Sequence, residues 1–414
     1  MKNIETKTVD CCTSPGLISV EQAIEKILSQ ASPVEQVERI NILDALNRVL
    51  AEDLHSTIDV PGYDNSAMDG YAVRSDDCQA SGVELPVSQR IPAGQVGALL
   101  EPGTAARIFT GAPIPEGADA VVMQERCEQK DDKVTVNTIV NAGANVRLAG
   151  EDIARGGSVL NAGKRLRPQE LGLLASVGLA EFKVKRKLKV ATFFTGDEII
   201  TPGQPLAAGQ IYNSNRYTLT GLLQAMDCEI VDLGIVPDTL EATLDVLEQA
   251  ASSADLVITS GGVSVGEEDY VRIALEKLGQ LTMWRIAMKP GKPVAFGKVN
   301  NALFMGLPGN PVSVFVTFLL FARALILKLQ GAEDCFVKRV SVTADFDWPQ
   351  IKRQEYLRVR LVEKDRQTVA QLFSHQGSGV LSSASWADGL IEVSIGQQIK
   401  QGDKVCYLPF EGLY

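Results

Sequence analysis

Between Leu188 and Gly331 the sequence alternates short apolar runs with longer amphipathic runs, and this alternation limits the fold more than any other feature. The apolar runs predict strands, and they are LKVATFF, CEIVDLGIV, DLVITS, MWRIAM and ALFMGL. The amphipathic runs predict helices, and they are NRYTLTGLLQAM, TLEATLDVLEQAA, DYVRIALEKLG and PVSVFVTFLLFARALILKL. Strands joined through helices pair in parallel, because the helix carries the chain back across the sheet. This region therefore predicts a doubly wound, parallel α/β sheet with helices on both faces.

The chain of 414 residues is too long for a single hydrophobic core, because such cores stop growing at about 250–300 residues. Outside residues 188–331 the sequence does not alternate predicted strands and helices in this way. Ser19 and Gln22 have the spacing of a capping box and predict a helix from Ser19, residues 44–54 predict a second short helix, and RPQELGLLASVG predicts a third. Pro and Gly interrupt short β-branched runs from Asp59 to Val159, which predicts a β-rich module. After Cys335 the pattern is β again, enough for a small barrel or sandwich.

Composition excludes several classes of protein. A net charge of -11, from 51 acidic and 40 basic residues, argues against a general nucleic-acid or membrane-surface binder. The seven cysteines include no CxxC pair and their number is odd, so reduced thiols in a cytoplasmic protein are expected. With only two histidines, carboxylates are the expected metal ligands, and they favour a hard ion such as Mg²⁺.

Neither the first residues nor the most apolar segment of the sequence predicts a membrane anchor. The first residues, MKNIETKTVDCCTSPG, lack the apolar core of a signal peptide. Residues 312–322 are apolar and uncharged, but a membrane-spanning helix needs about 20 such residues. We expect them to form a buried helix.

Three loops follow predicted strands of the α/β region and carry chemistry: TGDE (195–198), SGGVSVGEEDY (260–270) and LPGNPVS (307–313). Ligands of open α/β sheets bind beyond the carboxyl ends of strands, and glycine-rich turns that lead into helices suit anions. The alternative is plain turn chemistry, with acids favoured in the first turn of a helix by its dipole. The co-occurrence of three such loops favours a phosphate and metal site.

Lysines and a second acidic stretch add to this pattern. Lys289 and Lys292 in MKPGKP suit an anion, although both could be solvated turn residues. Asp238 could simply begin the next helix. Far upstream, residues 59–73, 107–125 and 145–153 bring acids together with Thr110 and Arg147. Such loops are often only turns, yet their length and acid content indicate a functional surface.

These motifs, DVPGYDNSAMDGYAV, TGAPIPEGADAVVMQE, AGEDI, TGDE, NSN, SGGVSVGEEDY, KPGKP, LPGNPVS and HQGSG, occur in one order between about Leu17 and Phe410. In content and order the chain resembles the molybdopterin molybdenumtransferase family, which is related to the gephyrin E domain. The resemblance implies four parts: an N-terminal helical and β region (1–58 and 150–187), a β-rich excursion (59–149), a molybdopterin-binding α/β domain (188–334) and a C-terminal β-barrel (335–414). It also implies a homodimer, whose cleft lies between the α/β domain of one copy and the N-terminal region of the other.

The implied reaction inserts molybdate into adenylyl-molybdopterin with Mg²⁺-dependent release of AMP. The resemblance assigns the catalytic acids to Asp69, Asp152, Glu198, Asp238 and Asp269. We expect Glu198 and Asp269 to bind Mg²⁺, since a hard cation on two phosphate oxygens needs carboxylate ligands. Residues expected at the substrate and its phosphates are Thr110, Arg147, Thr195, Gly196, Asp197, Ser260, Gly261, Gly262, Ser264, Lys289, Lys292, Pro308 and Pro311. For molybdate they are Lys292, Ser313, Arg358 and Ser378.

Two alternatives remain open on the sequence. The α/β region alone also resembles the adenylyltransferase of the preceding step, although the upstream motifs and the barrel belong to the molybdenumtransferase pattern. A non-catalytic scaffold of the same fold is the other. One departure from some relatives is that Arg147 stands alone where they carry an arginine run. Contact with the molybdopterin adenylyltransferase is a further expectation.

Overall fold

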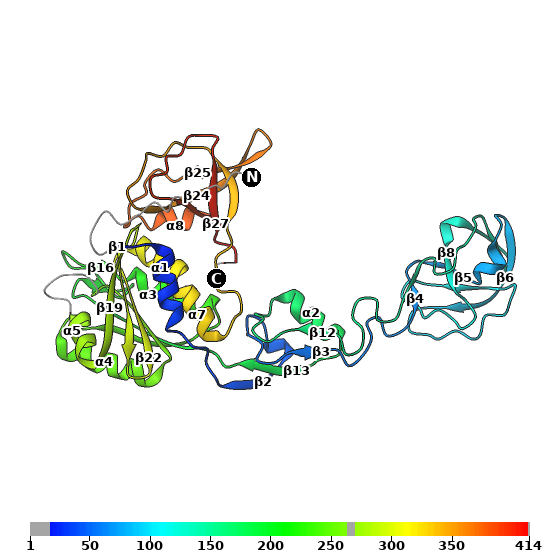
Figure 1. Cartoon of the computed structure of the whole chain (residues 1–414), viewed down its shortest axis with the longest axis horizontal. Helices are drawn as coiled ribbons and strands as arrows, with labels where there is room; N and C mark the ends of the chain where they lie inside the picture. Colours follow the sequence, from blue (N-terminus) through cyan, green and yellow to red (C-terminus); the bar gives the residue numbers. More distant parts are fainter. Residues whose placement is uncertain (1–16, 263–269, 413–414) are drawn as a thin grey trace, which may run out of the picture.

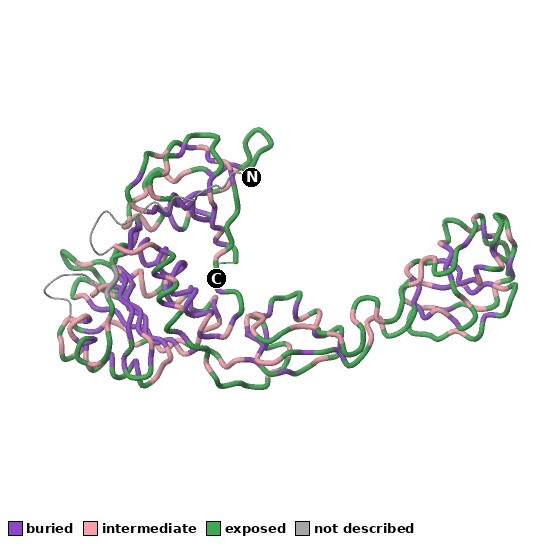
Figure 2. Tube along the Cα trace, in the orientation of Figure 1, coloured by how far each residue is buried: buried purple, intermediate pink, exposed green. Residues whose placement is uncertain are grey.

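The computed structural model of the chain describes residues 17–262 and 270–412, and it is elongated (Figure 1). The α/β domain and the barrel lie together at one end, and the β-rich excursion lies at the other. The N-terminal region bridges them. Buried residues gather in the sheet of the α/β domain, whereas the connections to the excursion are largely exposed (Figure 2).

The α/β domain is built on a seven-stranded sheet in the order β1-β19-β21-β22-β18-β14-β17. The strands are β1 (Leu17–Ile18), β14 (Lys189–Thr195), β17 (Glu229–Val236), β18 (Leu256–Ser260), β19 (Gly279–Ile286), β21 (Pro293–Val299) and β22 (Ala302–Leu307). Strands β22, β18, β14 and β17 are parallel, as predicted.

The predicted parallel pairing does not extend to the whole sheet, because β21 runs antiparallel to both β19 and β22. Strand β21 was not predicted from the sequence. Residues Asn300 and Asn301 join β21 to β22 in a two-residue hairpin, and Asn300 has a φ of 52°. Asparagine tolerates this left-handed conformation, so the Asn pair was the available indication of a hairpin.

Helices cover both faces of the sheet, as predicted. The core on one face contains residues of α1 (Val20–Ser29), α3 (Ser214–Ala225) and the continuous run of α6 (Pro311–Thr317), the π-helix η4 (Phe318–Ala322) and α7 (Arg323–Gln330). The core on the other contains α4 (Leu240–Ser253) and α5 (Tyr270–Leu278). The run Pro311–Gln330 is long and apolar enough to cross a membrane, but 89% of its most apolar window is buried inside the protein. The expected buried helix is therefore confirmed.

The N-terminal region is partly as predicted. Ser19 and Gln22 form the expected capping box at the start of α1, with both hydrogen bonds at 3.1 Å, and α2 (Pro168–Ser176) matches the third predicted helix. The predicted helix over 44–54 is wrong: a 3₁₀ turn, η1 (Ile42–Asp44), ends before Asn47, whose φ of 66° is incompatible with a helix. Two-stranded sheets complete the region, from β2 (Val37–Asn41) with β13 (Glu181–Lys185) and from β3 (Leu54–His55) with β12 (Ser158–Leu160).

The excursion holds a six-stranded sheet in the order β8-β5-β7-β6-β10-β9. Its strands are β5 (Gly70–Val73), β6 (Val83–Ile91), β7 (Ala105–Ile108), β8 (Ala120–Met123), β9 (Cys127–Lys130) and β10 (Lys133–Val136). A short pair, β4 (Asn65–Ser66) with β11 (Val146–Arg147), joins it to the N-terminal region.

The C-terminal strands close into a barrel, which confirms one of the two predicted architectures. β24 (Gln354–Lys364) pairs with both β25 (Gln367–Leu372) and β26 (Gly389–Val393), and β23 (Val340–Ala344) and β27 (Lys404–Pro409) complete the ring. A short strand of the α/β domain, β20 (Met288–Lys289), also pairs with β24. The barrel is thereby joined to the lysine-bearing turn of the α/β domain.

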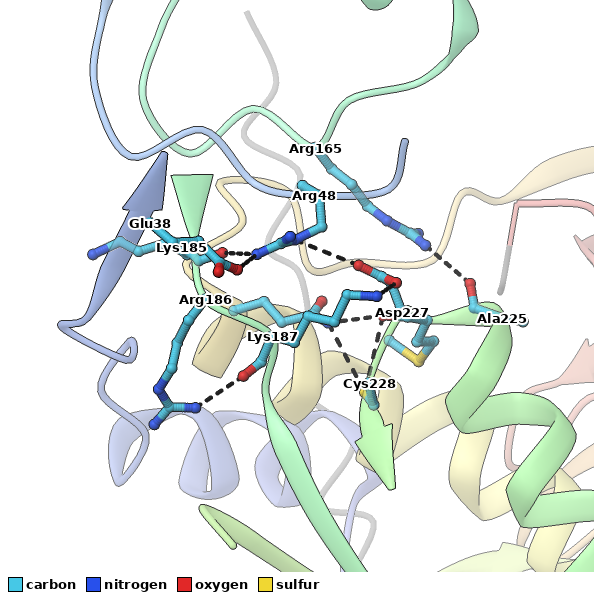
Figure 3. A network of polar contacts seen from close by, with 11 residues as sticks. Glu38, Arg48, Arg165, Lys185, Arg186, Lys187, Ala225, Asp227 and Cys228 are labelled. Carbon is cyan, nitrogen blue, oxygen red and sulfur yellow. Dashed lines mark hydrogen bonds and ion pairs between the residues drawn. The ribbon is translucent and has the colours of Figure 1, made fainter. Parts of the chain in front are cut away.

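Polar contacts join the N-terminal region to the α/β domain just after α3 (Figure 3). Asp227 accepts a hydrogen bond from Lys187 and lies 3.5 Å from Nε of the buried Arg48, which also binds Glu38. Nearby, Arg186 donates two 2.7 Å hydrogen bonds to the carboxylate of Asp255.

Candidate functional site

The loops predicted to bind a ligand emerge side by side, because β22, β18, β14 and β17 are neighbours and parallel. The Gly261 amide donates to the carbonyl of Leu307 (3.1 Å), which joins the loop after β18 to the loop after β22. The Asn215 side chain, at the start of α3, donates to the carbonyl of Gly309 (2.7 Å). The SGG, LPGN and NSN motifs therefore form one edge of the domain.

A cavity of about 420 Å³ lies at this edge and receives residues from both the α/β domain and the barrel. Seven of the predicted substrate or molybdate residues line it: Gly261, Gly262, Lys289, Lys292, Pro308, Ser313 and Ser378. It also contains Met288, Pro290, Gly291, Pro293, Gly309, Asn310, Arg353 and Gln376. Asn310 and Gln376 lie inside the motifs LPGNPVS and HQGSG, whereas nothing in the sequence distinguishes Arg353.

Basic groups give the cavity its positive character. Lys289 Nζ is 3.1 Å from a carboxylate oxygen of Glu355, whose other oxygen accepts a 3.0 Å hydrogen bond from Trp348. Lys292 and Arg353 complete the basic lining. No side chain of the described lining is acidic, so an anionic ligand meets no like charge within it.

The TGDE loop adjoins the same edge. Thr195 is buried, and a Cβ added to Gly262 would lie 3.0 Å from its hydroxyl. Gly196 has a φ of 141°, and the Glu198 carboxylate folds back over it, within 2.6 Å of where a Cβ would stand. Only glycine fits at these two positions. Asp197 and Glu198 are exposed, so the carboxylate of Glu198 is accessible to a ligand or a hydrated cation.

Three buried polar atoms at this edge lack hydrogen-bond partners within the described residues: Ser260 Oγ, Asn213 Nδ2 and Asn215 Oδ1. Buried polar groups are usually paired, so these atoms suit a bound ligand or water. Asp238 follows β17 at the outer edge of the parallel strands. Pro311 is the first residue of α6, and Ser313 is buried within its first turn.

Arg358 does not line the cavity, although it was predicted to bind molybdate. Its side chain is only 1% exposed. Its guanidinium donates to Ser383 Oγ (3.1 Å), to the Tyr356 carbonyl (3.0 Å) and to the Gly377 carbonyl (3.3 Å). Burial lowers the pKa of Arg358 to about 10. The residue lies behind the loop that bears Gln376 and Ser378 and supports it.

That loop is also attached to the α/β domain. The Ser378 carbonyl accepts a 3.0 Å hydrogen bond from the Val312 amide in α6. Gln376 is bound in both directions to the backbone of Arg358, accepting from its amide (2.9 Å) and donating to its carbonyl (3.0 Å). The barrel therefore presents Gln376 and Ser378 in a defined position.

The upstream prediction forms a second, separate group in the chain. Asp69 Oδ1 accepts hydrogen bonds from the amide (2.8 Å) and the hydroxyl (2.7 Å) of Thr110, and these bonds lower the pKa of Asp69. Asp64 accepts from the Ala149 amide (2.8 Å) and holds the stretch that follows Arg147. Asp152 is exposed, and its amide donates to the Val60 carbonyl (3.0 Å).

This upstream group lies at the excursion end of the molecule, far from the cavity of the α/β domain (Figure 1). One chain thus does not bring its two predicted groups together. Ser264 and Asp269 lie outside the described residues, so their positions stay predictions. Within residues 17–262 and 270–412, no group of three or more His, Cys, Asp or Glu side chains is arranged to hold a metal.

Three family models match consecutive parts of the chain. They are "MoeA N-terminal region (domain I and II)" over residues 18–178, "Probable molybdopterin binding domain" over 191–328 and "MoeA C-terminal region (domain IV)" over 341–410. The order of the three matches is the order of the structural parts.

Relatives match most of the length. The molybdopterin molybdenumtransferase of Haemophilus influenzae is 49% identical over 317 residues, which cover 76% of this chain and 78% of that protein. That of Nostoc is 41% identical over 337 residues, with coverage of 78% and 77%. Among solved structures, a molybdopterin biosynthesis MoeA protein from Pyrococcus horikoshii OT3 is similar with a TM-score of 0.80 and 30% identity, covering 95% of this chain and all of that one.

Proposed function

The chain belongs to the molybdopterin molybdenumtransferase family, and we propose that it inserts molybdate into adenylyl-molybdopterin and releases AMP. The observation that carries this proposal is the cavity of about 420 Å³ in which loops of the α/β domain and the barrel meet around Lys289, Lys292 and Arg353. In a chain with a net charge of -11, a lining whose described residues include basic side chains and no acidic ones is a selective environment for phosphate and molybdate.

In this proposal the glycine-rich loop supplies a backbone hydrogen-bond donor to phosphate, and the lysines supply positive charge. Gly261 and Gly262 have φ values of 88° and 63°, which turn the backbone sharply at the end of β18. The Gly261 amide already donates to the Leu307 carbonyl, so the Gly262 amide is the donor of this turn that we assign to phosphate oxygens. Lys292 supplies a mobile point charge beside it. Lys289 shares its charge with Glu355, so phosphate would compete with that carboxylate for it.

Hydroxyl and amide donors suit the tetrahedral molybdate dianion. Ser313 and Ser378 line the cavity from two parts of the structure, one from α6 and one from the barrel, and Gln376 belongs to the same barrel loop as Ser378. Neutral donors bind an oxyanion less tightly than guanidinium groups do, which favours its release to the sulfur atoms of the pterin. Arg358 acts through the 376–378 loop as a positioning residue.

Magnesium is the proposed metal, with Glu198 and Asp269 as its ligands. Glu198 is an exposed oxygen donor on a loop at the phosphate-binding edge, and hard cations bind such donors together with phosphate oxygens. When bound, Mg²⁺ would neutralise charge on the pyrophosphate. Asp238 lies at the outer part of the same edge and is a further candidate for contact with the substrate.

We propose that the working unit is a homodimer in which the upstream group of one copy faces the cavity of the other. The proposal rests on the separation of the two groups within one chain (Figure 1). The carboxylate of Asp69 is fixed by Thr110 on the surface of the excursion and is fully open to a partner. Asp152 and Arg147 would approach from the same side. The expected setting is the cytoplasm, beside the adenylyltransferase that supplies the substrate.

The experiment that tests the function measures AMP released by purified protein from adenylyl-molybdopterin with Mg²⁺, with and without molybdate. We expect AMP release that depends on Mg²⁺ and yields molybdenum cofactor when molybdate is present. Formation of adenylyl-molybdopterin from ATP and molybdopterin would instead identify an adenylyltransferase. Activity that is absent in both assays would favour a scaffold and contradict the proposal. AMP release that is unchanged in Lys292→Ala would contradict the assignment of the site to this cavity.

A further inference from the structure

A second cavity, of about 730 Å³, lies where the N-terminal region, the α/β domain and the barrel meet. Residues 163–167 of the N-terminal region form one side, the connection after α7 forms another, and the end of β27 with Gly412 forms the third. The Gly163 carbonyl accepts a 3.0 Å hydrogen bond from the Glu333 amide, which holds two of these sides together. The predicted molybdenumtransferase site does not include any residue of this lining.

The lining is basic although the chain is acidic. Five basic side chains, Lys164, Arg165, Arg167, Arg323 and Lys338, outnumber three acidic ones, Glu333, Asp334 and Glu411. Glu170, which is not part of the lining, binds Arg167 (2.6 Å) and lies 3.7 Å from Lys164. Asp334 accepts a 3.1 Å hydrogen bond from the Phe336 amide. Among the ion pairs and hydrogen bonds just given, Arg165 and Lys338 have no carboxylate partner.

Arg165 lies in the wall of the cavity, and one hydrogen-bond donor of its guanidinium has no partner within the described residues. Its Nη2 donates to the carbonyl of Ala225 at 3.3 Å, the contact seen at the end of α3 in Figure 3. Its Nε is buried and has no hydrogen-bond partner within residues 17–262 and 270–412. A buried, unpartnered donor on a charged group costs free energy of folding, which a nearby anionic charge would offset.

A buried guanidinium, that of Arg323, lies close to the half-buried Arg165. Arg323 is 6% exposed and donates to the carbonyl oxygens of Cys335 and Gly412, both at 3.2 Å, with a favourable field from Asp334. Burial lowers the pKa of Arg323, and the positive charge of Arg165 lowers it further. Burial likewise lowers the pKa of Arg165. Two like charges in a poorly hydrated wall are stabilised when an anion lies between or beside them.

We propose that this cavity binds a dianionic oxyanion of the phosphate class, held by the guanidinium of Arg165 with Arg323 behind it and Lys338 at the mouth. Guanidinium groups present planar donor pairs that match phosphate oxygens. A volume of about 730 Å³ exceeds the needs of an inorganic ion and accommodates a small phosphate monoester. Because the three sides belong to three structural parts, the bound anion stabilises their relative orientation.

Calorimetric titration at low ionic strength tests the proposal with inorganic phosphate and, separately, glycerol 2-phosphate. We expect Arg165→Gln to weaken the binding of either probe by about tenfold, the loss expected for one charged hydrogen bond. Lys338 is exposed, so Lys338→Gln serves as a variant that does not disturb folding, and we expect a few-fold loss. The matched control is Lys26→Gln, which removes the same charge from the exposed surface of α1.

Hydrogen exchange separates this cavity from the one at the α/β edge, which also has the charge to bind phosphate. Saturating phosphate should slow exchange in residues 163–167 and 332–338 of the unmodified chain and of Lys292→Ala, but not of Arg165→Gln. Tighter binding of glycerol 2-phosphate than of phosphate would identify a monoester as the ligand, and equal binding would identify the inorganic ion. Affinities that are the same in Arg165→Gln, Lys338→Gln and Lys26→Gln would overturn the proposal.

Discussion

Replacing Arg358 with methionine tests whether a buried guanidinium holds the barrel loop at the candidate site. Methionine has a similar length and removes three hydrogen bonds, to Ser383, Tyr356 and Gly377. At roughly 1.5 kcal/mol for each hydrogen bond from a charged donor, the loss is about 4–5 kcal/mol. Burial lowers the pKa of Arg358 to about 10, so removing the buried charge recovers about 3–4 kcal/mol. The expected net destabilisation of the barrel is therefore about 1 kcal/mol.

Hydrogen exchange at pH 7 measures this locally, which matters because a multidomain chain does not unfold in one step. We expect faster exchange in residues 373–383 and molybdate binding that is weaker by about tenfold, since Ser378 would no longer be fixed. The control is Arg360→Met on the same strand, where an exposed guanidinium donates to the Trp386 carbonyl and lies over the Trp386 ring. Unchanged exchange and affinity in Arg358→Met would refute the positioning role. A loss of affinity without a change in exchange would instead make Arg358 a direct ligand.

Three further predictions concern single contacts. Burial raises the pKa of Asp255, but hydrogen bonds from Arg186 and the Lys189 amide, with the charges of both side chains, together lower it below its usual value. The stability that the Arg186–Asp255 pair contributes is therefore present above the ordinary carboxyl pKa and is lost as pH falls, so Asp255→Asn should reduce resistance to urea more at pH 7 than at pH 3. The Thr110 hydroxyl helps to lower the pKa of Asp69, so Thr110→Val should raise it and reduce AMP release most at acidic pH, which a pH profile would detect. Burial raises the pKa of Cys228 to about 12, so mass spectrometry should find it unalkylated at pH 8 until the protein is unfolded.

The parts of the fold that could be predicted from the sequence are those with a regular apolar period. The helices of the α/β domain repeat every three or four residues, and the capping box of α1 is a local pattern, so both could be found without the structure. The prediction of a helix at 44–54 is wrong because Val49 and Leu50 form β-bridges with residues distant in the sequence instead of packing on a helix face. The missed strand β21 begins at a proline and contains a glycine, and pairing on both sides overrides those weak local preferences.

Local sequence patterns likewise predict one part of the candidate site, and the other part depends on long-range strand pairing. The loops at strand ends could be predicted to meet, because parallel neighbours place their carboxyl ends together. The sequence could not indicate that Arg353 lines the cavity, nor that Arg358 points behind it, since both depend on how β24 pairs with β20 and β26. The sequence also could not indicate that β1 and α1 pack on the α/β sheet. The pairing of β1 with β19 joins Leu17 to Arg285, which are far apart in the chain.

Complementation between two inactive variants tests most directly the claim that the active centre is shared between two copies. Asp69→Asn removes the upstream carboxylate, and Lys292→Ala removes a lysine from the cavity of the α/β domain. In an equal mixture refolded or co-expressed, half of the dimers are mixed, and each mixed dimer has one intact and one doubly altered centre. The account predicts about one quarter of the unmodified rate of AMP release from the mixture, with neither variant active alone. A mixture as inactive as its components, in a preparation shown to contain mixed dimers, would contradict it.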